Sequence, residues 1–139
     1  MAIFLNNNVG FKLNSVDLSD HVTAFTLNRS VDQVEVTAMG DTAHKFVAGL
    51  ASDTLTVSFL NDTAVGSVLA TLQDNYGATV TWGAIQVKGT AVSATNKLYT
   101  GTLLIDNVTD INGAVADEAT LDITFTCNSK TVVASTGTF

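Results

Sequence analysis

Apolar and polar residues alternate along most of this chain, and a period of two residues is typical of a β-strand with one buried face. In the segment 121–125, the apolar Leu121, Ile123 and Phe125 are separated by Asp122 and Thr124. Similar alternation runs through 54–59, 79–84 and 99–105, and further strands are expected over 22–27 and 31–37. The sequence therefore predicts a mainly β fold in a single domain spanning residues 1–139.

The polar positions of these strands are mostly threonine rather than lysine or glutamate. Threonine favours the extended backbone and is only mildly polar. A threonine face can lie in water or against another subunit. The pattern is compatible with self-assembly without requiring it.

One segment, 63–76, has the period of a helix instead. Its apolar residues Val65, Val68, Leu69, Leu72 and Tyr76 form a single stripe. Asp62 or Thr63 is expected to cap its N-terminus, and Gly77 is expected to end it. We expect this helix to lie across a sheet as cover for the core.

Two long connections separate the predicted strands. The first, 39–52, has no clean period and yet contains Phe46, Val47 and Leu50. It is expected either to contact a partner or to fold back onto its own core. The second spans 106–118 and contains Asn112-Gly113, a turn signal.

The sequence contains no proline and few lysines to protect strand edges. Unprotected edges pair readily with other chains. The terminal segments 1–9 and 130–139 carry apolar residues, and they are expected to be either arms that contact a neighbouring subunit or ordinary terminal strands.

Charge and composition exclude several classes of function. The net charge is −7, and the six Lys and Arg residues are scattered, whereas a DNA-binding protein needs a basic patch. No segment has the length of a membrane span or the pattern of a signal peptide, so synthesis in a cytoplasm is expected. Charged residues make up only 14% of the chain, so either much of the surface is buried in an assembly or the exterior is covered by Thr, Ser and Asn.

The residues that perform catalysis or bind metals are too few or wrongly spaced. His21, His44 and Cys127 do not form a recognisable ligand set. Asp110-Ile111-Asn112-Gly113 lacks the other ligands of a calcium loop. Ser19-Asp20-His21 is contiguous, which is unsuitable for a catalytic triad on a strand. We expect no enzyme activity and no cofactor.

Several runs of residues resemble the major tail (tail tube) proteins of siphophages. They are Val16–Val22, Val34–Ala43, Phe46–Leu50, the strand Leu55–Phe59 with the helix after it, and Asn96–Thr102. The resemblance extends from about Val9 to Phe125.

This resemblance implies a β-sandwich or half-barrel with one flanking helix. Copies would form rings, six to a ring, whose strands continue into a shared inner barrel. Stacked rings would form the tube of a virion tail, assembled in the cytoplasm of a host bacterium, through which DNA passes without specific binding. Tape-measure, tail-tip and terminator proteins would be the other partners.

The resemblance also implies roles for three groups of residues. The stacking loop between rings would contain Met39, Gly40, Asp41, His44, Lys45, Phe46, Val47, Gly49 and Leu50. The acids expected to line the lumen, on polar faces of strands, are Asp32, Glu35, Asp106 and Asp122. The arms between subunits would contain Ile3, Phe4, Leu5, Val132, Val133 and Phe139.

Two other interpretations remain open from the sequence. One is a β-sandwich module that decorates a capsid or binds a receptor, which would expose aromatic clusters or a ligand pocket. The other is a ring protein of a contractile injection system, with a similar fold.

Overall fold

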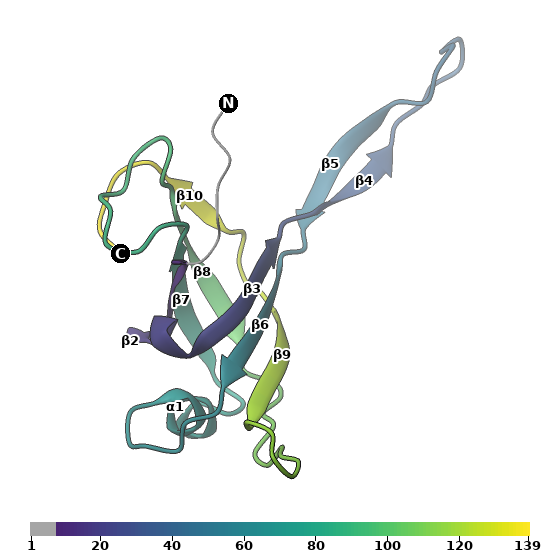
Figure 1. Cartoon of the computed structure of the whole chain (residues 1–139). Coiled ribbons are helices and arrows are strands. Elements are labelled where there is room, and N and C mark those ends of the chain that lie inside the picture. The colour runs from purple at the N-terminus through teal and green to yellow at the C-terminus, as the bar shows by residue number, and fades with distance from the viewer. Residues whose placement is uncertain (1–7) are drawn as a thin grey trace.

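The structure is a computed structural model, and it describes residues 8–139. Figure 1 shows a β-rich body from which one long hairpin projects. The elements in chain order are β1 Gly10–Leu13, β2 Val16–Asp17, the 3-10 helix η1 Ser19–His21, β3 Val22–Asn28, β4 Val31–Glu35, β5 Phe46–Ala51, β6 Thr54–Leu60, α1 Val68–Asp74, β7 Thr79–Ile85, β8 Leu98–Leu104, β9 Thr120–Thr126 and β10 Val132–Ala134.

Two antiparallel sheets form the body. One has five strands in the order β10-β8-β7-β1-β2, and the other has three in the order β3-β6-β9. The inward residues of β6 and β9 are directly paired, for example Val57 with Ile123, and both are buried. This confirms the mainly β fold and the alternation over 54–59 and 121–125.

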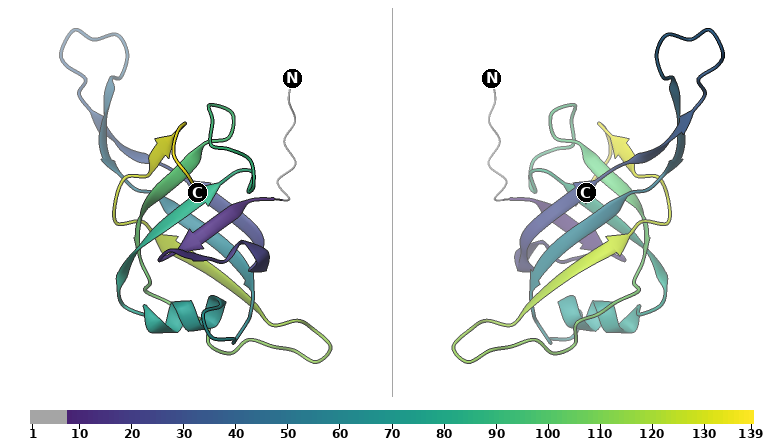
Figure 2. Two further views of the ribbon diagram at one scale, coloured as in Figure 1. Left: turned by 90° about the vertical axis from the view of Figure 1, so that its left-hand side faces the viewer. Right: turned by 90° about the vertical axis from the view of Figure 1, so that its right-hand side faces the viewer.

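The sheets are joined along one side, where Leu103 and Cys127 form a bridge between β8 and β9. Between the sheets, the ring of Phe11 lies 5.4 Å from that of Phe25 and 6.0 Å from that of Phe59. Figure 2 shows the two sheets curving around this core, with α1 across one end. Deleting a buried ring such as Phe59 in a core of this kind typically costs about 3–5 kcal/mol of stability.

The predicted helix 63–76 is shorter in the structure, where α1 spans Val68–Asp74. Gly66 has a φ of +78°, outside the helical region, so the chain turns there and the helix begins only after Ser67. Val65 is consequently 102% exposed and Tyr76 is also exposed, so the prediction that both face the core is wrong. Gly77, with a φ of +80°, follows the end of the helix as expected.

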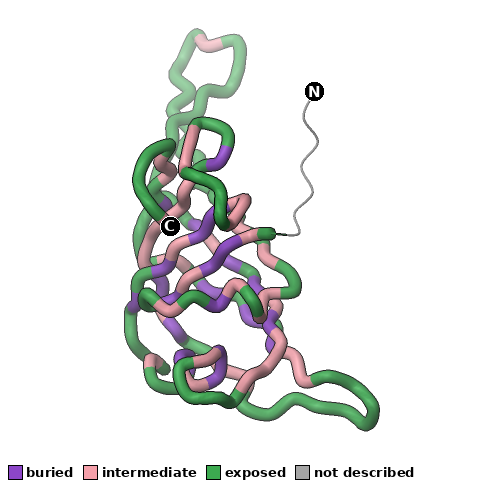
Figure 3. The backbone as a smooth tube through the Cα atoms, turned by 60° about the vertical axis from the view of Figure 1, so that its left-hand side comes forward, coloured by how far each residue is buried: buried purple, intermediate pink, exposed green. Residues whose placement is uncertain are grey.

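The first long connection contains a strand that the sequence did not indicate. Residues Phe46–Ala51 form β5, which pairs with β4 to make a hairpin. Residues 42–52 are all exposed, and Figure 3 shows the hairpin extending away from the buried residues of the body. The expectation that 39–52 folds back onto its own core is therefore wrong.

The second connection, 105–119, turns at a different place from the one predicted. The tight turn spans Ala114–Asp117, where the Asp117 N–H donates to the Ala114 carbonyl, rather than Asn112-Gly113. Asn112 instead donates its side-chain amide to the Thr120 carbonyl at 2.8 Å. The side-chain bond anchors the loop to the start of β9.

The C-terminal segment packs on its own chain. Val132–Ala134 pair with β8. The Phe139 ring approaches Gly10, which has no side chain to obstruct it, and the Lys12 ammonium lies 4.5 Å from the ring centroid. The N-terminal residues of the predicted arms, Ile3, Phe4 and Leu5, lie outside the described residues.

Candidate functional site

The residue groups that resemble catalytic motifs have structural roles here. His21 Nε2 lies 2.9 Å from Asp62 Oδ2, and Ser19 interacts with Asp17 rather than with His21. No three His, Cys, Asp or Glu side chains of residues 8–139 gather to hold a metal ion. In the same range, no helix is long and apolar enough to cross a membrane.

The three-stranded sheet leaves two strand edges open. Within the described chain, β3 and β9 are its outer strands, and each pairs with β6 on one side. The other side of β9 meets β8 only at its C-terminal end, through the bridge between Leu103 and Cys127. The Cys127 N–H donates to the Asp53 carbonyl at 3.0 Å, and the Ser52 N–H donates to the Ser30 carbonyl at 2.7 Å. Backbone groups alternate in direction along an antiparallel strand. The backbone groups of Asp122 and Thr124 therefore point outward from β9, where the Thr124 carbonyl accepts a 3.4 Å bond from the side-chain amide of Asn107.

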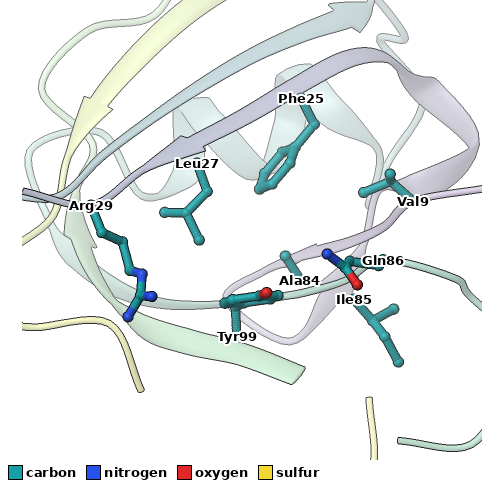
Figure 4. A pocket seen from close by; sticks show the side chains of 8 residues that line it. All are labelled: Val9, Phe25, Leu27, Arg29, Ala84, Ile85, Gln86 and Tyr99. Carbon is teal, nitrogen blue, oxygen red and sulfur yellow. The ribbon is translucent and has the colours of Figure 1, made fainter. Parts of the chain in front are cut away.

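By the same alternation, the backbone N–H and C=O groups of Phe25 and Leu27 point outward from β3. Their side chains point inward, over an apolar crevice of about 360 Å³ that also borders Ala84 and Tyr99 (Figure 4). Arg29 lies at one end of this crevice. An open edge beside an apolar crevice is the arrangement to which an added strand binds.

The outer face of the three-stranded sheet is almost uncharged. Its outward side chains, set by the strand pairing, are Ala24, Thr26, Asn28, Thr54, Thr56, Ser58, Leu60, Thr120, Asp122, Thr124 and Thr126. Asp122 carries the only charge among them. This face is mostly polar, and it spans all three strands.

The hairpin continues this sheet, because β3 leads into β4 and β5 leads into β6. The Ser30 hydroxyl donates to the Ser52 carbonyl, which continues the hydrogen bonding between the two strands where the hairpin meets the sheet. At the tip, Lys45 Nζ lies 2.7 Å from Asp41 Oδ1, and the Ala38 N–H donates to Asp41 Oδ2. The bond from Lys45 and that from Ala38 lower the pKa of Asp41. The tip thus has a defined conformation although it contacts no other part of the body.

The hairpin also exposes apolar side chains. Met39, Phe46, Val47 and Leu50 are all exposed, and Leu50 is 81% exposed. An isolated two-stranded hairpin is marginally stable in water. The exposed apolar side chains are therefore available to a partner, whose contact would stabilise the hairpin.

The predicted stacking residues Met39–Leu50 therefore share one projecting element, but the predicted lumen acids do not share one face. Asp122 lies on the outer face of the three-stranded sheet, whereas Asp32 and Glu35 lie on β4 in the hairpin. Oε2 of Glu35 there accepts a 2.9 Å hydrogen bond from His44 Nδ1. Asp106 lies beyond the end of β8, so its expected position on a strand is wrong.

Sequence reasoning missed the strand β5 and the open edges of β3 and β9. Val47 and Leu50 belong to an apolar run without alternation, because both faces of the hairpin are exposed. The regular alternation in 54–59 identified β6, but nothing in the sequence indicated that β3 and β9 flank it.

Comparison with known proteins gives matches at the level of structure. No protein-family model matches the sequence, and no curated protein matches it either. A chain in the virion of a native gene transfer agent particle aligns with a TM-score of 0.74 and 12% identity, covering 95% of this chain and 99% of that one.

A chain in the tail of an empty gene transfer agent particle, obtained by helical refinement with C6 symmetry, aligns with a TM-score of 0.69 and 12% identity. That alignment covers 96% of this chain and 99% of the other. At this identity the comparison establishes a shared fold along nearly the whole chain: mainly β, with antiparallel sheets and one α-helix.

Proposed function

We propose that this chain is a structural subunit of a phage-like tail tube, which assembles into stacked rings that conduct DNA. The observation that carries the proposal is the three-stranded sheet, from which a hairpin extends. Its β3 edge has no second strand neighbour, and its β9 edge has none except where Cys127 bridges to Leu103. The fold shared with a chain from the tail of an empty gene transfer agent particle supports the same conclusion.

In this proposal, the open edge of β9 in one copy pairs with the open edge of β3 in the next. Both strands are antiparallel to β6, so they run in the same direction. Copies related by rotation therefore join by parallel pairing, and the contact uses two different surfaces. Such a contact closes into a ring when the rotation between neighbouring copies divides a full turn into a whole number of copies. The C6 symmetry of the structural neighbour favours six copies.

The outer face of the three-stranded sheet would then line the inner surface of the tube. Threonine and serine hydroxyls offer DNA no fixed positive charge, and Asp122 repels phosphate. Six copies place a ring of carboxylates at each level of the tube, which lets DNA pass without specific binding. Of the four acids expected in the lumen, Asp122 has the best structural support.

The hairpin would provide the contact between stacked rings. Its exposed apolar residues, Met39, Phe46, Val47 and Leu50, would be buried there. We retain the terminal arms as a further proposal: Val133 and Phe139 pack on their own chain in the monomer, and they can also border a neighbour in the ring.

A proline on the open edge tests the proposed ring contact. Thr124→Pro removes an N–H that points away from β6, so the fold is maintained while pairing with the next copy is blocked. Thr124→Val retains the N–H and is the matched control. Sedimentation velocity over a range of concentrations is expected to show rings for the wild type and Thr124→Val and a folded monomer for Thr124→Pro. Rings of equal stability in Thr124→Pro would refute the contact.

A further inference from the structure

The charge of this chain is concentrated at one end of the molecule. The segments 61–78 and 105–122 contain seven acidic residues and no Lys or Arg: Asp62, Asp74, Asp106, Asp110, Asp117, Glu118 and Asp122. The other six acids are balanced by all six Lys and Arg residues, so the remainder of the chain is neutral and the net charge of −7 belongs to these two segments.

The two segments lie together, and we call them the acidic end. Gln73 Nε2 donates to Asp110 Oδ1 at 2.8 Å. The Gly77 N–H donates to the Ile105 carbonyl at 2.7 Å, and the Asn61 N–H donates to the Ala119 carbonyl at 2.9 Å. These bonds join α1 and its flanking turns to the connection between β8 and β9.

The acidic end presents apolar side chains on a loop. In the segment 106–119, Ile111 is 92% exposed and Val115 is 101% exposed, and Asp110, Asp117 and Glu118 lie close in sequence to them. Large apolar side chains at a loop tip gain free energy when another surface covers them. Carboxylates around them favour a surface that carries positive charge.

A surface of that kind lies at the base of the hairpin. Arg29 and Lys130 line a hollow of about 210 Å³ together with Ser30, Val31, Ala51 and Asp53, and we call this the hinge hollow. Asp53 is buried and binds the Thr131 N–H, which leaves the hollow with one net positive charge. In the described chain, neither Arg29 nor Lys130 forms an ion pair within 4.0 Å. Val31 and Ala51, which line the hollow and pair with each other across the hairpin base, are both exposed.

The loop and the hinge hollow lie toward opposite ends of the molecule. In Figures 1 and 2, the loop between β8 and β9 is at the end that carries α1, and the hairpin is at the other end. Copies stacked in one orientation bring the loop of one copy toward the hairpin base of the next. Stacking acidic end against acidic end would oppose seven negative charges with seven more, which costs free energy.

We infer that the loop 106–119 of one copy docks into the hinge hollow of a second copy in the adjacent ring. Ile111 and Val115 pack against Val31 and Ala51, while Asp117 and Glu118 face Arg29 and Lys130. The contact joins different surfaces and can repeat without closing, so it gives the tube a direction. This inference rests on the proposed function, because it identifies the partner surface of the hairpin base.

Charge exchange between the two surfaces tests the inference. The loop variant Asp117→Lys/Glu118→Lys and the hollow variant Arg29→Glu/Lys130→Glu each oppose like charges across the contact. The combination of all four substitutions restores opposite charges and returns the net charge to −7. The control Asp20→Lys/Thr90→Lys/Ala91→Lys raises the net charge by four, as the loop variant does, at exposed sites outside the acidic end and the hollow.

Electron microscopy and sedimentation then measure the protein concentration at which rings stack. Each two-residue variant is expected to form rings but to need at least about tenfold more protein to stack them. The four-residue variant and the control are expected to stack like the wild type. Circular dichroism confirms that every variant is folded.

Three results overturn the inference while the proposed function stands. The first is a loop variant that stacks like the wild type. The second is a four-residue variant that does not recover, or a control that is equally impaired, which would indicate a general effect of charge. The third is a hollow variant that stacks normally but loses binding to duplex DNA, which would make Arg29 and Lys130 a DNA contact. A wild-type protein that never forms rings overturns the proposed function and the inference with it.

Discussion

The backbone N–H of Thr131 donates a 2.8 Å hydrogen bond to Oδ2 of Asp53, and both residues are buried. Asp53 lies between β5 and β6, at the base of the hairpin, whereas Thr131 precedes β10. The carbonyl of Asp53 also accepts the Cys127 N–H. One residue thus fixes the hairpin base to the segment that connects the two sheets.

Asp53→Ala is expected to reduce the free energy of unfolding by about 1–3 kcal/mol, because the Thr131 N–H is left buried without an acceptor. Asp53→Asn retains an oxygen acceptor, so its free energy of unfolding is expected to fall less than that of Asp53→Ala. Denaturant unfolding measures both, with the exposed Asp20→Ala as control. Faster hydrogen exchange at Val31 and Ser52 in Asp53→Ala would show that the hairpin base has loosened. Equal stability of Asp53→Ala and wild type would contradict this role.

Stability is expected to fall in acid. Burial by itself raises the pKa of Asp53, but bonds from Thr131 and Ser30 and the charge of Arg29 outweigh it and lower the pKa. The Ala64 N–H is the main cause that lowers the pKa of Asp62. A carboxyl group with a lowered folded-state pKa stabilises the fold above its unfolded value of about 4, and this contribution is lost as the pH falls through the folded value.

Thermal unfolding between pH 7 and pH 3 checks this expectation. Tm should change little above about pH 5 and decrease below about pH 4. The decrease should be smaller in Asp53→Asn, which has no carboxyl group at that position to protonate. A Tm that is constant down to pH 3 would show that these bonds do not favour the ionised carboxylates.

The hairpin is expected to contribute to assembly and little to folding. Replacing residues 31–51 by Asn-Gly connects Ser30 to Ser52 through a two-residue turn. Since the hairpin contacts none of the buried core, the free energy of unfolding should remain within about 1 kcal/mol of wild type. Electron microscopy should show rings that no longer stack. Tubes of normal length formed by this variant would show that the hairpin is not the stacking element.

Asp122→Lys tests the proposed lumen surface. Reversing the only charge on the outer face of the three-stranded sheet should make assembled tubes retain duplex DNA, with affinity that decreases as salt rises. Asp106→Lys makes the same charge change beyond the end of β8 and should retain less DNA. Cosedimentation of tubes with labelled DNA measures both variants. Equal retention by the two variants would place Asp122 outside the lumen.

The strands that face the core could be predicted from the sequence, because burial of one face imposes the alternation. Leu55, Val57 and Phe59 illustrate this in β6. The limits of α1 were mispredicted because the apolar stripe from Val65 to Tyr76 is interrupted by Gly66, whose positive φ depends on the surrounding fold. The spacing of apolar residues does not reveal a local backbone conformation of this kind.

The surfaces proposed for assembly could be predicted only in part. The apolar content of Met39–Leu50 indicated a contact with a partner, but β5 has two exposed faces and therefore no alternation by which to recognise a strand. The open edges depend on which strands are neighbours, and the hinge hollow joins Arg29 to Lys130 across a hundred residues of chain. Such relationships are set by topology, which the local sequence does not encode.

Electron microscopy of the purified wild-type protein at increasing concentration is the most direct test of the proposed tail tube. We expect hollow rings that stack in one orientation into tubes, with β9 of one copy paired in parallel with β3 of the next when the tubes are resolved at high resolution. A protein that remains a monomer at every concentration and salt condition, or a closed dimer joined by two β3 strands, would contradict it.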